Sequence, residues 1–191
     1  MKRRDFLYVI PGVLGSFAFL AEVRKLPITM FFEDDGIVPN SKLPLLLYKK
    51  AFDERNNDGA EWLEKRFQTN DWSNSWRNGI FDFQHYHSIA HEVLGIYSGE
   101  AEVLLGGDQG EKVIVEAGDI IVIPAGVGHK NLGSHNLGVV GAYPEGMPVD
   151  IIRCQPGDRP GTDRNIAAVP NPKTDPLDGK SGSLLKLWGK S

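Results

Sequence analysis

The sequence predicts an all-β fold, either a barrel or a sandwich, from two observations. From Gly79 onward, short runs rich in β-branched and aromatic residues recur about every eight residues, and no helical period separates them. The chain also contains 22 glycines and 12 prolines, most of which fall between these runs and supply turns. Many short strands joined by tight turns are typical of barrels and sandwiches, because both architectures fold an antiparallel sheet onto itself.

The composition is that of a single soluble globular domain. The chain has 191 residues, which is enough to enclose one hydrophobic core, with 41% hydrophobic and 24% charged residues. The net charge of −4 argues against a nucleic-acid partner, which would require a basic surface. Cys154 is the only cysteine, so an internal disulfide is excluded. We interpret this thiol as structural or incidental, with a reactive thiol as the alternative.

The amino-terminal residues 1–24 have the layout of an export segment, which leaves 25–191 as one domain. A basic head, Lys2 to Arg4, precedes an apolar run from Phe6 to Ala21 that is too short to favour a membrane-spanning helix. The stretch "RRDFL" also resembles the twin-arginine export signal. We therefore expect a periplasmic or otherwise exported domain with no membrane partner of its own. The alternatives are an uncleaved anchor and a cytoplasmic protein with a misassigned start.

The first elements of the domain are expected to be two strands and a helix. A short strand is predicted near residues 28–32 and a second at Leu45–Tyr48, with a turn at Asp34–Gly36 between them. The stretch 58–70 is predicted to be a helix with Asp58 as its N-cap. Its apolar residues recur at helical spacing, which predicts that one face packs on a sheet.

The strands that follow Gly79 are predicted from alternation and from turn residues. In "IFDFQHYH", residues 80–87, Phe83, His85 and His87 alternate with polar residues and so share one face of a strand. The tail from 156 to 178 is expected to be irregular, and "LLKLW" after it is expected to dock as a short strand or helical turn. Further strands are predicted at 92–99, 100–107, 112–119, 120–126 and 137–146.

Glycines, histidines and a glutamate within these strands match two motifs. The pattern resembles the cupin superfamily (RmlC-like), whose motifs read G-x5-H-x-H-x(3,4)-E-x6-G and G-x5-P-x-G-x2-H-x3-N. The closing Asn is absent, since Gly133 occupies its position and Asn131 stands two residues earlier. The matching residues lie within 79–99 and 118–133, and they are Gly79, His85, His87, Glu92, Gly99, Gly118, Pro124, Gly126 and His129.

The resemblance extends to one group of bacterial single-domain cupins, labelled YjlB-like. Stretches such as "HYHSIAHEVLG", "IPAGVGHKNLG" and "VVGAYPEG" carry this likeness, which spans residues 28–188. It implies a double-stranded β-helix (jelly-roll) barrel, here with one N-terminal helix and an irregular C-terminal tail. It also implies a metal inside the barrel mouth, but it does not imply one reaction, because a shared fold carries many chemistries.

The predicted metal ligands are His85, His87, Glu92 and His129. Three imidazoles and a carboxylate suit one divalent transition metal, and Mn, Fe, Ni, Zn, Co and Cu all remain open. An ion that accepts six ligands would keep two positions for water, O2 or a substrate. The alternative is a buried polar cluster without a metal, which would be costly to bury.

Residues near the ligands are candidates for the substrate pocket, with a structural alternative for each. Arg77 could bind a substrate carboxylate or pair within the protein, and Tyr97 and Tyr143 could offer hydroxyls or simply pack. Phe83 is expected to contribute an apolar floor beside the ligands. His91 is expected to face away from Glu92 as a surface residue or a support for the ligands, with a role as a metal ligand as the alternative. His135 is expected to be exposed in a turn.

The function predicted from these residues is metal binding, with an activity that the sequence leaves open. The first hypothesis is a metal-dependent enzyme, such as a dioxygenase or an isomerase, that acts on a small organic molecule. No separate general base is evident, since Glu92 would bind the metal, so no catalytic residue is assigned. The alternative is a non-enzymatic protein that binds a metal or small ligand. A homodimer that pairs through the strand near residues 28–32 is a further expectation.

Overall fold

The computed structural model describes residues 26–189. The predicted export segment, residues 1–24, therefore lies outside the described residues. Within 26–189, no helix combines the length and the apolar character that crossing a membrane requires.

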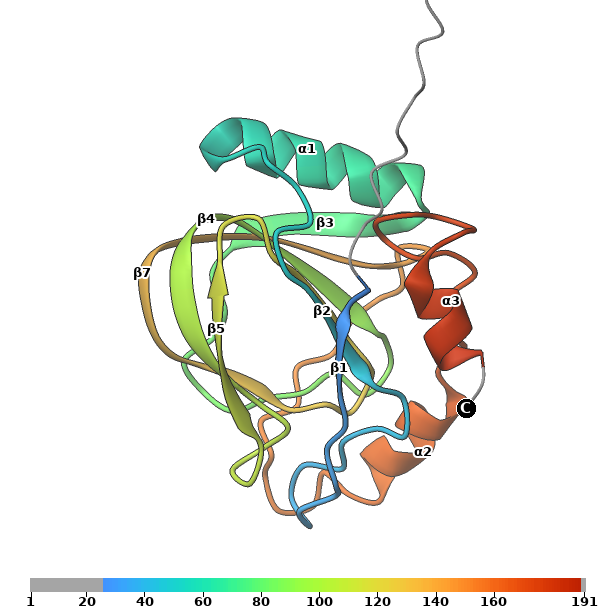
Figure 1. Ribbon diagram of the computed structural model, residues 1–191. Coiled ribbons are helices and arrows are strands. Elements are labelled where there is room, and N and C mark those ends of the chain that lie inside the picture. The colour runs from blue at the N-terminus through green and yellow to red at the C-terminus, as the bar shows by residue number, and fades with distance from the viewer. Residues whose placement is uncertain (1–25, 190–191) are drawn as a thin grey trace, which may run out of the picture.

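The described residues form one antiparallel sheet of seven strands that curls into a barrel (Figure 1). The strands follow the order β1-β2-β6-β4-β7-β3, and β5 pairs with the second half of β4. The predicted all-β jelly-roll barrel is thereby confirmed. The strand bounds are β1 Ile28–Met30, β2 Leu45–Tyr48, β3 Trp72–Asn78, β4 Glu92–Leu105, β5 Glu111–Glu116, β6 Ile120–Ile123 and β7 His129–Pro144.

Two long strands, β4 and β7, run around the barrel and organise it. They pair with each other along nearly their whole length, while β6 pairs with the first part of β4 and β5 with the last part. Register shifts interrupt the β4–β7 ladder at Ile96/Ser98, Ser98/Glu100 and Glu102/Val103. Such irregularities bend a strand and increase its twist, which allows one strand to contribute to both sides of the barrel.

The length of these strands corrects two predictions. Residues 92–99 and 100–107 were predicted as separate strands, but β4 runs through Gly99 without a turn. The stretch around His135 was predicted as a turn, but it lies within β7, and only its exposure agrees with the prediction. Glycine and asparagine indicate a turn in a sequence, whereas here they occupy positions where a continuous strand bends.

Residues 80–87 do not form the predicted strand. They lie in the connection between β3 and β4, and only His85 and Tyr86 form isolated bridges, to His129 and Ile152. The regular strand of this region is β3, which precedes the alternating stretch and pairs with the end of β7. Alternation therefore selected His85 and His87 correctly, but Phe81 on the same predicted face is exposed and Tyr86 on the other is fully buried.

The helix after β2 was predicted correctly, but its start was not. Helix α1 spans Asn56–Thr69 and lies across the barrel with Leu63 and Phe67 buried (Figure 1). The N-cap is Arg55, which makes no capping side-chain bond, so Asp58 lies in the first turn, where its charge favours the helix dipole. Leu63 packs on Gly95 of β4, where a Cβ atom would lie 2.5 Å from the leucine methyl.

The core has two parts because both sides of several strands are covered. In β2, Leu45 and Leu47 face the barrel interior, whereas Leu46 and Tyr48 face the helices. Strands β2 and β6 are buried at every position, which explains why their sequences are continuous apolar runs rather than alternating ones. The barrel interior and the helix-covered layer therefore stabilise the same sheet from opposite sides.

The C-terminal tail is more ordered than predicted. Helix α2, Gly161–Ala168, falls inside the stretch that was predicted to be irregular, and an Arg159–Asp163 ion pair supports its first turn. Only Thr162 is buried in this helix, so the sequence shows no apolar stripe to reveal it. Helix α3, Ser183–Trp188, fulfils the expected docking as a short helix, with Leu184 and Trp188 buried beside the barrel (Figure 1).

The buried carboxylate of Asp175 connects the C-terminal tail to β2 through hydrogen bonds. Asp175 accepts hydrogen bonds from the Tyr48 hydroxyl at 2.8 Å and from the backbone N–H groups of Leu177 at 2.8 Å and Leu184 at 3.0 Å. Its side chain is wholly buried, so each of these donors would lose its partner if the carboxylate were removed.

Asp175→Ala is therefore expected to lower the free energy of unfolding by about 3 kcal/mol, because three buried donors lose a charged acceptor. The measurement is urea unfolding followed by fluorescence. Asp82→Ala, at an exposed position, is the control and should stay within about 0.5 kcal/mol of the wild type. Equal stability of the two variants would contradict the anchoring role of Asp175.

Candidate metal centre

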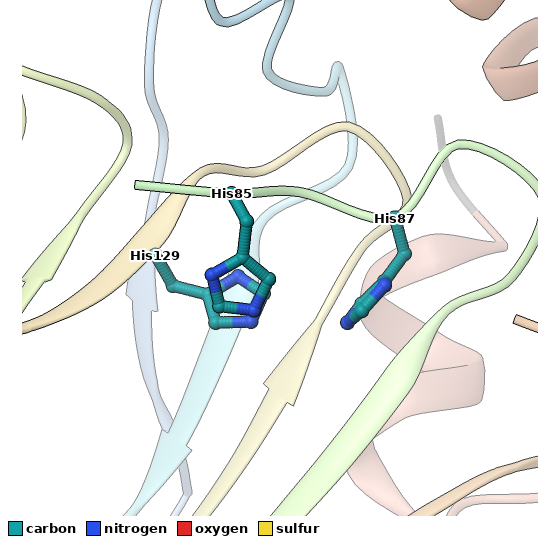
Figure 2. Close-up of side chains that lie close together, drawn as sticks. All are labelled: His85, His87 and His129. Carbon is teal, nitrogen blue, oxygen red and sulfur yellow. The ribbon is translucent and has the colours of Figure 1, made fainter. Parts of the chain in front are cut away.

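Three histidines meet inside the barrel. His85 and His87 come from the connection before β4, and His129 begins β7. One ring nitrogen from each histidine lies within 4.8 Å of the corresponding nitrogens of the other two. All three residues are buried. Figure 2 shows the rings converging from these two segments on one space. The structure therefore brings together the three histidines that the motifs selected.

The outer nitrogen of each ring is held by a backbone carbonyl. Because a carbonyl only accepts, each Nδ1 must carry the proton and donate it, so in the neutral ring the Nε2 lone pair lies on the side facing the cluster. This is the arrangement in which histidine binds a metal, since the second hydrogen bond fixes both ring orientation and tautomer. The pairs are His85 Nδ1 with Phe83 O at 3.1 Å, His129 Nδ1 with Val127 O at 3.2 Å, and His87 Nδ1 with Asp150 O.

Glu92 completes the cluster from the first position of β4. Its Oε2 atom lies 3.3 Å from His87 Nε2 and 3.4 Å from His129 Nε2, and the side chain is buried. Two donor atoms on one ion at about 2.1 Å lie roughly 3.0–3.4 Å from each other. The spacing of the carboxylate from these two imidazoles is therefore that of neighbouring ligands on one ion.

Two aromatic side chains orient this carboxylate. The Tyr143 hydroxyl donates to Glu92 Oε1 at 3.1 Å and accepts from the Trp76 indole N–H at 2.8 Å. Trp76 is in register with Gly141 of β7, where a Cβ atom would lie 2.2 Å from the indole ring. The absence of a side chain at Gly141 thus allows Trp76 to lie against the strand and to reach Tyr143.

Burial and mutual charges separate the pKa values of the ligands. Burial, followed by the nearby His129 and His87, lowers the pKa of His85 to about 3. Burial would raise the pKa of Glu92, but the facing histidines hold it far below its ordinary range. Burial alone would lower the pKa of His87, but Glu92 outweighs it and the pKa is raised. His85 is therefore neutral at physiological pH, as a metal ligand must be.

A cavity of about 260 Å³ opens onto the four clustered side chains. Phe81 and Ile151, which are 42% and 48% exposed, stand at its solvent side. The remaining apolar lining consists of Trp76, Ile80, Leu94 and Val149. The cluster is thus buried in the protein yet reachable by a small molecule.

Two of the predicted substrate residues line this cavity. Tyr143 does so beside Glu92, as described above. Arg77 also lines it, but its guanidinium forms a bidentate pair with Glu64 of α1, at 2.7 Å for both bonds. The structure thus shows the intramolecular pairing that was the alternative for Arg77.

The other two predicted substrate residues lie outside the cavity lining. Phe83 stacks on Phe81 with ring centroids 4.8 Å apart and lies under the Arg153 guanidinium. Tyr97 packs in the layer between the sheet and α1, and its ring covers Gly138. Their substrate roles remain predictions of the sequence without a contact to support them.

His91 is buried, so the expectation of a surface residue was wrong. Its Nδ1 accepts the Ala125 N–H at 3.0 Å, and its ring lies 4.7 Å from that of Trp188. Burial lowers its pKa to about 4. No local pattern indicates this burial, because Trp188 of α3 meets His91 only in the folded chain.

Asp150 supports the site without any motif to reveal it. Its carbonyl accepts from His87, and its carboxylate accepts the Ser88 N–H at 2.7 Å and the Ser88 hydroxyl. It follows β7 in the stretch "PEGMPVD", which contains no metal-binding pattern. Only the return of this segment alongside His87 makes it part of the site.

Comparisons with known proteins identify a relative by sequence. No family model matches the chain. The uncharacterized protein YjlB of Bacillus subtilis (strain 168) is 40% identical over 164 residues, covering 85% of this chain and 96% of the relative. The chain belongs to the YjlB family. This membership confirms the YjlB-like resemblance that stretches such as "HYHSIAHEVLG" carry.

Solved structures that are similar to this YjlB-family chain are more distant. Acireductone dioxygenase from Bacillus anthracis, with cadmium in its active centre, is 17% identical with a TM-score of 0.40, covering 56% of this chain and 82% of its own. A DUF861 family protein from Thermotoga maritima is 26% identical with a TM-score of 0.29, covering 47% of this chain and 92% of its own. Each of these two structural similarities extends over about half of the YjlB-family chain.

The lowered pKa of His85 predicts an acid-sensitive fold in the chelator-treated protein. Below about pH 6.5 the unfolded chain binds a proton at His85, whereas the folded chain does not until about pH 3. The free energy of unfolding should therefore fall on acidification through this window, and His85→Gln should show a shallower fall. Urea unfolding at several pH values between 7 and 4.5 measures the slope. His135→Gln, at an exposed position, should keep the wild-type slope, and equal slopes in all three proteins would contradict the prediction.

Proposed function

We propose that His85, His87, Glu92 and His129 bind one divalent transition metal and that this chain is a metal-binding cupin. The observation that carries the proposal is the set of three buried imidazoles whose Nδ1 atoms face carbonyls while their other nitrogens converge. A cluster oriented in this way has its lone pairs directed at a common point.

The donor atoms restrict the identity of the metal to the divalent transition ions. Three neutral imidazoles with one carboxylate suit the borderline ions, so Mn, Fe, Co, Ni, Cu and Zn are all acceptable. Burying these polar groups together would be unfavourable without a compensating partner, and a cation between them supplies one. When bound, such an ion supplies a Lewis acid or a redox centre.

The cavity favours an enzyme over a closed binding site. Four protein ligands leave room on a six-coordinate ion, and the cavity of about 260 Å³ borders those ligands. We infer that the protein acts on a small organic molecule held there, in dioxygenase or isomerase chemistry. A non-enzymatic metal or ligand carrier is the second candidate, and turnover of a bound molecule distinguishes the two.

Tyr143 acts in this proposal as a positioning residue. Burial and the nearby Glu92 raise its pKa well above the ordinary value, so its hydroxyl keeps its proton and donates to the carboxylate. The bond to Oε1 leaves Oε2 directed at the histidines. Trp76 supports the same hydroxyl from β3.

The proposal predicts that purified protein contains about one equivalent of metal and that His87→Ala loses most of it, because one of four donors is removed. Elemental analysis of both proteins measures this directly. His91→Gln is the matched control, because His91 is a buried histidine one residue from Glu92 whose ring faces Trp188 instead. Metal-free wild type, or equal metal in wild type and His87→Ala, would overturn the proposed site.

Tyr143→Phe is expected to weaken metal affinity by about 10-fold, because groups that hydrogen-bond to metal ligands typically contribute 10–100-fold. Competition with a fluorescent chelator gives the affinity. Tyr97→Phe removes the same hydroxyl outside the cavity and should leave the affinity unchanged. Equal affinities for the two variants would show that Tyr143 does not position Glu92.

A further inference from the structure

We propose that Asp150 is a positioning residue that couples the metal ligand His87 to one wall of the cavity. The wall residues that Asp150 holds, Val149 and Ile151, then determine how well a wider molecule fits beside the metal. The inference rests on the metal proposed above. It adds to the four ligands a segment, residues 148–151, that selects among the molecules reaching them.

The segment 148–151 forms one wall of the cavity. Val149 and Ile151 are lining residues, and both come from the connection that follows β7. Ile151 is 48% exposed, so this wall reaches the solvent side. Within the described part of the chain, neither side chain belongs to the two buried core clusters or to the residues packed against them. Packing on the core is therefore not what fixes this wall.

Asp150 provides the hydrogen bonds that hold the segment. Within residues 26–189, every hydrogen bond of residues 148–151 involves Asp150. Its Oδ1 atom accepts the Ser88 N–H at 2.7 Å, its Oδ2 atom accepts the Ser88 hydroxyl, and its backbone carbonyl accepts from His87 Nδ1. One residue therefore determines how the wall lies against the segment that carries His87.

The backbone direction explains why the wall faces the cavity. Ile152 and Tyr86 exchange two backbone hydrogen bonds, at 2.9 and 3.1 Å, so the two segments run antiparallel at this point. Successive side chains of an extended chain project to opposite sides. Since the carboxylate of Asp150 points to Ser88, the apolar side chains on either side of it point the other way, into the cavity.

Helix α2 fixes the partner of this carboxylate. Ser88 is wholly buried, and its hydroxyl accepts from Asn165 Nδ2 at 3.0 Å while it donates to Asp150. A hydroxyl can make both bonds because it carries one hydrogen and two lone pairs. The hydroxyls of Tyr86 and Thr162 join the same helix to the neighbouring residue at 3.0 Å. The wall is thus held through a continuous chain of polar contacts to α2.

Two properties should therefore depend on the Asp150 carboxylate. Without it, the backbone carbonyl remains but is no longer held beside His87, so the imidazole loses its fixed orientation. The wall would also have to be ordered each time a ligand binds, which costs binding free energy. A residue that acted on stability alone would change neither property in the folded, metal-loaded protein.

Two hydroxamic acids test the proposal, because they share one chelating group and differ in the width of the body. Acetohydroxamic acid carries a methyl group and benzohydroxamic acid carries a ring. Each is titrated into the Co(II)-loaded protein and followed by the visible absorption of the cobalt. In the wild type the ring should bind more tightly, since it buries apolar surface on the wall. In Asp150→Ala the ratio of the two affinities should fall by about 5-fold or more, and the Co(II) affinity by about 10-fold.

Asp175→Ala is the matched control. Asp175 also accepts from backbone N–H groups and a hydroxyl, but it connects the C-terminal tail to β2. Its removal should lower stability while leaving the affinity ratio and the Co(II) affinity unchanged. Asp150→Asn should recover most of the ratio, because the amide oxygen can still accept the Ser88 N–H.

Ser88→Ala tests the same link with Asp150 in place, and it serves if Asp150→Ala does not fold. It removes one hydrogen bond to the carboxylate and should lower the affinity ratio by about 2-fold. An unchanged ratio in whichever of the two variants folds would overturn the role of Asp150. An equal fall in Asp175→Ala would refute it as well, because the effect would then follow general loosening.

A cobalt titration of the wild type comes first and separates this inference from the metal site. Failure to bind one equivalent of Co(II) would overturn the metal site, and the role of Asp150 would fall with it. Stoichiometric cobalt with no change of the ratio in the Asp150 or Ser88 variants would overturn the positioning role alone.

Discussion

The reciprocal backbone hydrogen bonds between His85 and His129 are the interaction on which the site depends. The His85 N–H donates to the His129 carbonyl at 3.2 Å, and the His129 N–H donates to the His85 carbonyl at 2.8 Å. These bonds join the connection before β4 to the first residue of β7. Two further bonds continue this pairing on either side, from the Asn131 N–H to the Phe81 carbonyl and from the Gly126 N–H to the His87 carbonyl, each at 2.8 Å.

Barrel curvature supplies the fourth member of the cluster. In the ladder, His129 pairs with Leu105 at the far end of β4 from Glu92. Yet its Nε2 lies 3.4 Å from the Glu92 carboxylate. A flat sheet would separate the two ends of a 14-residue strand, so only a sheet that closes on itself brings them together. The bends in the β4–β7 ladder are therefore a condition for the site as well as for the fold.

Rigid surroundings on every side hold the cluster in place. Backbone carbonyls fix the histidine rings, Tyr143 and Trp76 fix the carboxylate, and Asp150 fixes the turn at Ser88. Further out, α1 occupies Arg77, and α3 covers the side of β4 where His91 lies. The helices thus contact polar side chains as well as the apolar layer that they cover.

The sequence by itself determined the β-rich fold, helix α1 and the four clustered side chains, because periodicity and motif spacing are local properties of the chain. Of the four substrate candidates that it offered, Tyr143 and Arg77 are among the cavity lining residues, whereas Phe83 and Tyr97 are not. Tertiary structure alone decided that Arg77 pairs with α1, that His91 is buried and that Asp150 supports His87. Each of these outcomes depends on a contact between segments far apart in the chain, and a local pattern does not specify which distant segment will cover a given side chain.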